Sequence, residues 1–339
     1  MHLKYLYLKE FRGFTELTIT DISASARLVM LIGPNGTGKS SIFDALLTWS
    51  AIHGGLGHDW DQAFHVKHSA NEQYNWKQTI KTVELHEGEP TDANGWRKMC
   101  YFRSAYRNEP DFSQGNLGAL PDPSERRFRK TIDNDAAVSA NYRRLVMQTI
   151  RDVWGSGPNR DISLADYANA VVVTVNKSLE KVLPHLKLES LGDPASDTGN
   201  FYFSKGISRG YLYKNLSGGE KAVFDLLIDL ITRATYFDDS IICIDEPESH
   251  INPAVQGALL RELLALTPEK CQLWIATHGL GMLRCARDIE AKTPGTVAFI
   301  NFEANFDEPV VLRPIKMDRA MWQRSLEIAL DDLSEIGSL

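Results

Sequence analysis

Cysteine is scarce in this chain, and apolar runs of membrane-spanning length are absent from it. The four cysteines form no Cys-x-x-Cys pair and are accompanied by no paired histidines. This spacing argues against a zinc site and favours reduced thiols, to which we assign no role. Residues 2–8 resemble a strand rather than a charged leader with an apolar core. We therefore expect a soluble cytoplasmic protein without a membrane partner. The cysteines are Cys100, Cys243, Cys271 and Cys285.

Positive charge is also in short supply. The chain has 37 Lys and Arg residues against 44 Asp and Glu, a formal net charge of −7, so it is not a polycation that would coat nucleic acid. It has no internal repeat, no low-complexity segment and no long heptad pattern, which excludes solenoids and long coiled coils. With 43% hydrophobic residues, the 339 residues are enough for one large α/β domain with an inserted lobe.

A phosphate-binding loop is predicted at residues 33–40, where Gly-Pro-Asn-Gly-Thr-Gly-Lys-Ser lies between a strand-like run and a helical pattern. The glycines let backbone N–H groups surround a pyrophosphate, and the helix N-terminus adds partial positive charge. Lys39 would reach the β/γ-phosphates and Ser40 would ligate Mg²⁺. An ordinary glycine-rich turn is the alternative, but the flanking elements favour the phosphate loop. The predicted nucleotide contacts are Asn35, Gly36, Thr37, Gly38, Lys39, Ser40 and Ser41.

Two further apolar runs end in residues that suit phosphate chemistry. The run at 240–244 ends in Asp245 and Glu246, which fits a buried parallel strand that delivers acids to the edge of a sheet. We interpret Asp245 as the Mg²⁺ ligand and Glu246 as the residue that polarises the attacking water. Solvated loop acids are the alternative. The run at 272–276 precedes His278, which is either structural or a hydrogen-bond partner of the γ-phosphate.

The segment Leu216-Ser217-Gly218-Gly219-Glu220 precedes an amphipathic stretch. Taken alone, it is a helix start with a small polar cap and an acid in the first turn. Together with the phosphate loop, Asp245-Glu246-Pro247-Glu248 and Thr277-His278, it resembles an ABC-type ATPase. The resemblance implies ATP and Mg²⁺ as cofactors. It also implies that Ser217 caps the γ-phosphate bound to a partner chain, so that two chains enclose two ATPs in a dimer or higher oligomer.

Within that superfamily, the opening Phe11-Arg12-Gly13-Phe14 and the string at 245–253 resemble the SMC/RecF/OLD branch. In that branch the arginine, here Arg12, approaches the nucleotide. The string departs from the OLD-like pattern at Asn252, where His is usual, and Gly279 replaces a serine. The implied fold is a P-loop NTPase of the α/β class, an ABC-type head with a mixed central sheet and an inserted, mainly helical lobe. Catalytic roles fall to Glu246, His278 and Lys39.

The motifs divide the chain. We predict an ATPase core at 1–53 and 206–317, an inserted arm and helical lobe at 54–205, and a C-terminal helix at 318–339. The sixty residues after His278 cannot hold the nuclease domain of OLD proteins, so the chain resembles a stand-alone head whose effector, a nuclease or toxin, is a separate protein. The glutamine of the Q-loop is not placed by any motif; Gln114 and Gln148 are candidates.

A local excess of positive charge occurs at 97–151, with 11 Lys and Arg against 6 Asp and Glu. These residues either line a phosphate-backbone track for DNA or form a solvated helical face, and the two interpretations are equally supported. Arg103, Tyr106 and Arg107 are candidates for a place near the nucleotide or a partner. The candidate nucleic-acid contacts are Arg126, Arg127, Arg129, Lys130, Arg143 and Arg144.

Three functions remain open. The first is an ATPase whose closure and reopening control DNA engagement or an effector, in anti-phage defence or DNA repair. The second is an ATP-dependent scaffold in which binding, and not turnover, carries the function. The third, less favoured, is the nucleotide-binding subunit of a transporter.

Overall fold

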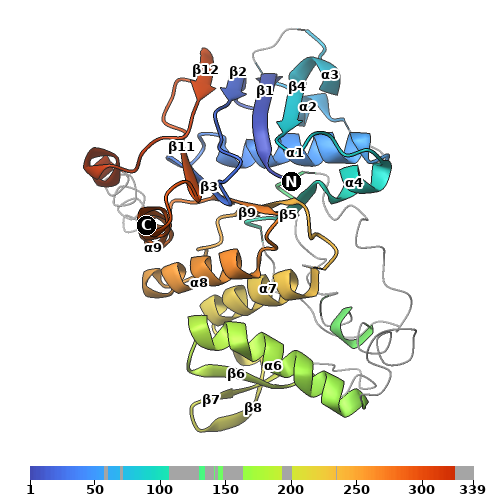
Figure 1. The fold of residues 1–339 in the computed structure, drawn as a ribbon, viewed down its shortest axis with the longest axis vertical. Coiled ribbons are helices and arrows are strands. Elements are labelled where there is room, and N and C mark those ends of the chain that lie inside the picture. Colours follow the sequence, from blue (N-terminus) through green and yellow to red (C-terminus); the bar gives the residue numbers. More distant parts are fainter. Residues whose placement is uncertain are drawn as a thin grey trace.

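The computed structural model describes residues 1–56, 60–68, 72–106, 130–133, 141, 144–147, 163–192, 201–233 and 235–324. Its strands lie in three sheets, stacked along the long axis of the molecule with helices between them (Figure 1). The phosphate loop connects strand β3 (Leu28–Ile32), which belongs to the central one of these sheets, to helix α1 (Lys39–His53).

The central sheet has the order β11-β3-β10-β9-β5, and every pairing in it is parallel. Residues of β3, β9 and β10 are all buried, as expected for apolar strands covered on both faces. Because the strands are parallel, their carboxyl ends meet at one edge, which brings Asp245, Ala276 and the phosphate loop together. The remaining strands of this sheet are β5 (Cys100–Arg103), β9 (Ile241–Asp245), β10 (Gln272–Ala276) and β11 (Val297–Asn301).

Alternate side chains of β3 enter two separate cores. Val29 and Leu31 pack with Ile42 and Phe43 of α1, whereas Met30 belongs to the core on the opposite face. That opposite face is covered by three helices that lie below the sheet in Figure 1. They are α7 (Gly218–Arg233), α8 (Pro253–Leu266) and α9 (Leu280–Lys292).

A second sheet, in the order β12-β2-β1-β4, lies beyond α1. Strand β1 pairs with β2 and β4 in antiparallel fashion, while β12 is parallel to β2. The predicted P-loop α/β class is confirmed, but the prediction of a mixed central sheet is wrong. The mixed pairing belongs to this separate sheet, whose strands β1 and β2 alternate buried with half-buried or exposed residues and so do not suit a central sheet that is covered on both faces. Its strands are β1 (Leu3–Phe11), β2 (Phe14–Ile19), β4 (Ile80–Leu85) and β12 (Pro309–Leu312).

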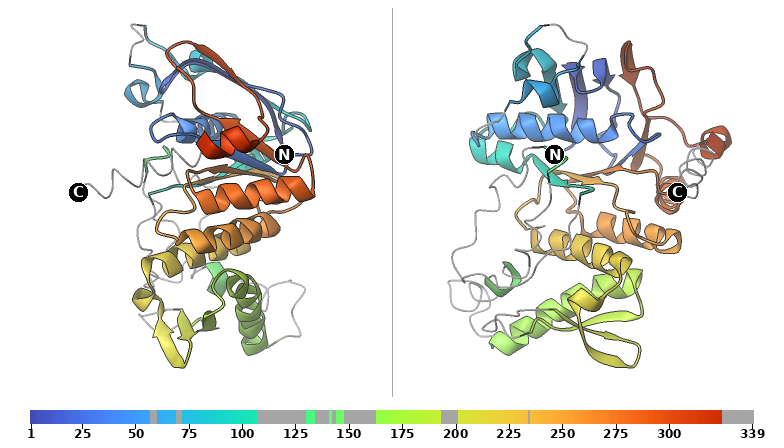
Figure 2. Two further views of the ribbon diagram at one scale, coloured as in Figure 1. Left: turned by 90° about the vertical axis from the view of Figure 1, so that its left-hand side faces the viewer. Right: turned by 180° about the vertical axis from the view of Figure 1, so that it is seen from behind.

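The far end of the molecule contains helix α6 and a three-stranded antiparallel sheet, β6-β7-β8, both below α7 and α8 in Figures 1 and 2. Strand β6 falls within the range predicted to be mainly helical. The short helices α2, α3 and α4 lie beside the second sheet and α1. The bounds are α6 (Leu164–Val182), β6 (Leu186–Ser190), β7 (Tyr202–Lys205), β8 (Ser208–Leu212), α2 (Gln62–His65), α3 (Trp76–Thr79) and α4 (Ala93–Lys98).

Two strands of the core fall inside the range 54–205 that the motifs assign to the insertion. Strand β4 pairs with β1, and β5 pairs with β9. Both pairings join residues distant in sequence, which no local pattern reveals. The division of the chain into domains remains a proposal, and in it β4 and β5 are assigned to the ATPase core. Residues 319–324 are helical, and the rest of the predicted C-terminal helix lies outside the described residues. Within the described part, no helix combines the length and apolar character needed to cross a bilayer.

Candidate functional site

The phosphate loop has the backbone conformations that its glycines allow. Gly33, Gly36 and Gly38 have φ angles of 144°, 77° and 91°, which residues with a Cβ rarely adopt. Gly38 is also constrained by packing, because a Cβ there would lie 2.6 Å from Cζ of Phe14. Lys39 Nζ donates hydrogen bonds of 2.8 Å to the carbonyl oxygens of Gly33 and Pro34. The lysine thus lies folded over the loop that it follows.

The end of β9 meets the start of α1. Ser40 Oγ donates a 2.9 Å hydrogen bond to Oδ1 of Asp245, which is 5% exposed. The next residue, Glu246, has a φ of 43°, a costly conformation for a residue with a side chain. The N–H of Glu246 donates to the carbonyl of Ala276 at 2.9 Å, which holds this turn in place. The predicted Mg²⁺ ligands are therefore adjacent, with Glu246 beside them.

These residues line one opening, which we call the phosphate-loop cleft. It has a volume of about 410 Å³, within the range of roughly 300–1,000 Å³ typical of ligand pockets. It contains all but one of the predicted loop contacts; Thr37 lines the neighbouring side cleft. The phosphate-loop cleft is lined by Arg12, Asn35, Gly36, Gly38, Lys39, Ser40, Ser41, Ala105, Tyr106, Thr131, Ile132, Asp245 and Glu246.

Arg12 lies between the two clefts. Its guanidinium is 3.7 Å from the centre of the Phe64 ring, and its Nη1 donates to the Phe64 carbonyl at 3.0 Å. Its Nε lies 3.6 Å from Oδ2 of Asp44, which also accepts two hydrogen bonds from Thr131. Burial raises the pKa of Asp44 to about 6, although Arg12 and Thr131 oppose this effect. The contacts hold Arg12 beside the phosphate loop.

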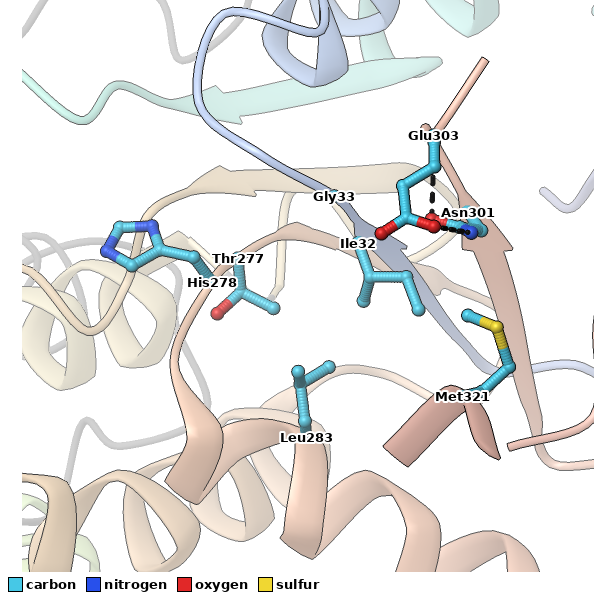
Figure 3. Close-up of a pocket in the computed structure, with 8 residues that line it drawn as sticks. All are labelled: Ile32, Gly33, Thr277, His278, Leu283, Asn301, Glu303 and Met321. Carbon is cyan, nitrogen blue, oxygen red and sulfur yellow. Dashed lines mark hydrogen bonds between the residues drawn. The ribbon is translucent and has the colours of Figure 1, made fainter. Parts of the chain in front are cut away.

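His278 does not line the phosphate-loop cleft. It borders a smaller pocket on the other side of the loop, together with Gly33, Thr277 and Glu303, and its ring points away from Ile32 and Leu283 (Figure 3). The backbone N–H of His278 donates to Oε1 of Glu248 at 2.9 Å. A contact between His278 and a γ-phosphate stays a prediction.

The signature segment starts helix α7 with a capping box. The N–H and Oγ of Ser217 donate to Oε2 of Glu220 at 2.9 and 2.8 Å. Burial opposes ionisation of Glu220, but hydrogen bonds from Lys205, Ser217 and His185 outweigh it and lower its pKa to about 2. Leu216 is buried, whereas Ser217 and Gly218 are exposed. Among the described residues that line the two clefts, none comes from 216–220.

Three lining residues were missed by the sequence interpretation: Ala105, Thr131 and Ile132. Tyr106, a candidate for a place near the nucleotide or a partner, does line the phosphate-loop cleft. Ala105 and Tyr106 reach the phosphate-loop cleft because β5 runs beside β9, and Thr131 and Ile132 because Thr131 is bonded to Asp44. Gln114, Gln148 and Arg107 lie outside the described residues. Arg103 is buried against Asp229 at 2.7 Å and lines neither cleft.

The two described candidates for nucleic-acid contact are engaged within the chain. Lys130 Nζ lies 2.5 Å from Oδ2 of Asp61, and Arg144 Nη1 donates to Asn141 at 2.8 Å. The other four candidates for nucleic-acid contact lie outside the described residues: Arg126, Arg127, Arg129 and Arg143. The structure therefore leaves the DNA track a prediction.

The four cysteines are buried, and no disulfide joins them. Burial raises the pKa of Cys271 to about 11 and also raises those of Cys243 and Cys285. Such thiols stay protonated and unreactive at neutral pH.

Comparison with solved structures identifies the fold. An SMC head bound to the C-terminal winged-helix domain of ScpA superposes with a TM-score of 0.53 at 12% identity, covering 95% of this chain and 99% of that one. The SMC head from Thermotoga maritima has 16% identity, a TM-score of 0.46 and coverages of 94% and 100%. An SMC head with an extended coiled coil, bound to the C-terminal domain of ScpA from Pyrococcus furiosus, has 12% identity, a TM-score of 0.49 and coverages of 99%.

Comparison with protein families gives two matches. Residues 5–90 match a family described as "AAA domain". Residues 61–282, about two thirds of the chain, match the family described as "AAA domain, putative AbiEii toxin, Type IV TA system". No curated protein matches the chain. The chain therefore belongs to this second family of AAA-type ATP-binding proteins, and its fold is that of an SMC-like ABC-type ATPase head.

Proposed function

We propose that this chain hydrolyses ATP as one half of a composite dimer, and that the resulting opening and closing controls a separate effector protein. The observation that carries the proposal is the 2.9 Å hydrogen bond between Ser40 and Asp245 in a cleft that also contains Lys39 and Glu246. A phosphate loop, a strand-end carboxylate and a second acid in one opening match the requirements of phosphoryl transfer to water.

The donor set fits Mg²⁺. One hydroxyl and one carboxylate are the hard oxygen ligands that this ion takes from a protein, while phosphates and water complete its shell. In the described residues there is no cluster of three or more His, Cys, Asp or Glu that would bind a metal unaided, which agrees with a site that needs the nucleotide. When bound, Mg²⁺ neutralises charge that develops on the phosphate oxygens.

Each remaining group has a role that its position supports. Lys39 exchanges its loop carbonyls for phosphate oxygens, and Arg12 contributes a cation beside the loop. Glu246 orients the attacking water and accepts its proton. Glu246 lines the same cleft as Lys39 and Ser40.

The composite dimer follows from the position of the signature. Ser217 and Gly218 are exposed, and both lie outside the clefts of their own chain. An exposed helix N-terminus suits an anion brought by another molecule. In the proposed assembly, the partner's phosphate loop presents this anion, so hydrolysis needs two chains.

The test is steady-state ATP hydrolysis by the purified chain, with light scattering to measure mass. We expect Lys39→Ala to abolish nucleotide binding, and Ser217→Arg to retain binding but to prevent both dimer formation and hydrolysis. Mixing the two variants is a sharper test, because each one supplies the part that the other lacks. Recovery of part of the activity supports the composite site; an active Ser217→Arg monomer contradicts it.

The second candidate is the ATP-dependent scaffold, favoured by the internal bonds of Lys39, which let the loop keep its shape without turnover. Glu246→Gln separates the two functions. A variant that binds ATP and dimerises but loses the partner-dependent effect supports the ATPase, whereas an unchanged effect supports the scaffold.

A protein effector is preferred to DNA as the controlled partner. One of the solved SMC heads carries a bound winged-helix domain of ScpA. Both described candidates for DNA contact, Lys130 and Arg144, are already paired within the chain. A role in defence or in repair follows from the effector. Hydrolysis that double-stranded DNA stimulates several-fold would instead favour DNA.

A further inference from the structure

The turn after β9 contains a buried carboxylate that the proposed chemistry does not use. Glu248 is 5% exposed and lies two residues beyond Glu246. Its Oε1 accepts three hydrogen bonds from the segment after β10: from Thr277 Oγ1 at 2.6 Å, from the N–H of His278 at 2.9 Å and from the N–H of Gly279 at 3.0 Å. One oxygen thus holds the whole turn in which His278 lies.

Two buried polar atoms at this contact have no hydrogen-bond partner within the described part of the chain. They are Oε2 of Glu248, an acceptor, and Nδ1 of His278, which donates in one of the two imidazole tautomers. Nδ1 lies 3.6 Å from Oε1 of the same carboxylate, slightly too far for a hydrogen bond. Because an unpaired buried polar atom is unfavourable, a small rotation of the ring that brings Nδ1 within hydrogen-bond distance of this carboxylate is favoured.

The packing supports this arrangement. A Cβ on Gly279 would lie 3.0 Å from Cγ and 3.2 Å from Cβ of Glu248, so the absence of a side chain at Gly279 lets the glutamate approach. Thr277 also donates through its hydroxyl, and its position at the end of β10 fixes the direction of the bond.

We propose that Glu248 is the positioning residue for His278: it accepts a hydrogen bond from Nδ1–H and so leaves Nε2 unprotonated, free to accept a hydrogen bond from the attacking water. Resting on the proposed ATPase function, this assigns a role to a residue that touches neither nucleotide nor water. A carboxylate that fixes the tautomer of a histidine typically contributes far more to the chemical step than to binding.

The first arm of the experiment does not depend on activity. Histidine is labelled with ¹⁵N, and the ring signals of His278 are assigned by their loss in His278→Gln. We expect Glu248→Gln to shift these signals at neutral pH, because the ring loses the acceptor that selects its tautomer. The matched control is Glu262→Gln. Glu262 is 4% exposed and bonded to Lys181, but it lies on α8 against α6. It should leave the His278 signals unchanged.

The second arm measures single-turnover hydrolysis. Glu248→Gln should lower the rate at saturating ATP by about 10- to 100-fold while the concentration for half-saturation changes less than about twofold. The double variant Glu248→Gln/His278→Gln should be no slower than His278→Gln alone. Thr277→Val, which removes one bond to the same oxygen, gives a smaller loss and serves if Glu248→Gln does not fold.

The two arms separate the failures. If the wild type does not hydrolyse ATP, the proposed function fails, and the His278 signals still decide the role of Glu248. If those signals are identical in wild type and Glu248→Gln, or if the losses of the two single variants multiply in the double variant, the positioning role is overturned.

Discussion

Gly219, in the first turn of α7, lies against the backbone carbonyl of His250: a Cβ on Gly219 would stand only 2.8 Å from that oxygen. The start of the signature helix therefore packs on the turn that follows Glu246. His250 itself has a φ of 67°, so it cannot move away from Gly219 without changing an already unusual backbone conformation. A displacement of the signature by a partner chain would act directly on this turn.

The neighbouring glycines provide a matched pair of variants. Gly219→Ala should lower the free energy of unfolding by about 1–3 kcal/mol, because its methyl group meets a backbone oxygen that cannot rotate away. At Gly218 an added Cβ meets nothing within 4 Å, so Gly218→Ala should be neutral or up to about 1 kcal/mol stabilising. Urea unfolding of the two variants measures the difference. Equal stability of the two would contradict the close contact.

Gly279 and Gly257 provide a second pair of variants, which are compared by their rates of ATP hydrolysis. Gly279→Ala pushes on Glu248 and on Gln256, whose Oε1 would lie 3.0 Å from the new Cβ. We expect a slower single-turnover rate with little change in stability. The control is Gly257→Ala on α8, where the added Cβ makes ordinary contacts of 3.4 and 3.5 Å. If both variants hydrolyse ATP at the same rate, the approach of Glu248 to the histidine turn has no effect on the chemistry.

The buried Asp44 predicts an unusual dependence of stability on pH. Its folded pKa is about 6, against 3.8 for an ordinary Asp, so between these values the folded chain binds more protons than the unfolded one. The contribution of Asp44 is therefore greatest below pH 4 and falls as the pH rises to 6, by roughly 3 kcal/mol. Burial lowers the pKa of His65 to about 4, which produces the opposite slope over nearly the same interval. The two slopes largely cancel in the wild type.

Asp44→Asn should reveal the pH dependence of stability that is due to His65. In this variant the slope due to His65 is no longer cancelled by that of Asp44, so the free energy of unfolding should fall steeply from pH 6.5 to pH 4. Denaturant unfolding at several pH values measures both curves. The same pH profile for the variant and the wild type would show that Asp44 titrates normally.

Glu220 gives a test at lower pH. Its pKa of about 2 lies below the ordinary value of 4.5, so its stabilising contribution is complete above pH 4.5 and is lost as the pH falls toward 2. Glu220→Gln should cost roughly 2 kcal/mol at pH 7, because Lys205 and Ser217 lose a charged acceptor. We expect the difference from the wild type to shrink at pH 3, as measured by thermal unfolding.

The sequence predicted those parts of the site whose chemistry is local. The phosphate loop, the acids at the end of β9 and the cap at Ser217 are each encoded within eight residues, and the expected loop–strand juxtaposition places Ser40 against Asp245. The roles of these residues in ATP hydrolysis remain predictions. The opening motif predicted that Arg12 approaches the nucleotide, and in the structure Arg12 lies beside the phosphate loop.

The missed features depend on contacts between distant segments. Strand β5 pairs with β9, so that Cys100 lies opposite Ile241, 141 positions further along the chain. No local sequence pattern predicts that pairing. Thr131 reaches the phosphate-loop cleft because Asp44 accepts its hydrogen bonds, 87 residues away. From the sequence, Glu248 stood out only as the last residue of the motif Asp245-Glu246-Pro247-Glu248. Its burial and its three hydrogen-bond donors depend on the folded chain, in which the ends of β9 and β10 lie together.

The folded-back position of Lys39 bears on how quickly and how selectively the loop captures its ligand. Because the ammonium group already has two oxygen partners, the arrival of a phosphate replaces these partners instead of ordering a loose chain. Association then loses little conformational entropy, and a ligand must outcompete two carbonyls before it is held. Isolated weak anions would be rejected by this exchange, whereas a polyphosphate, which offers several oxygens at once, would succeed.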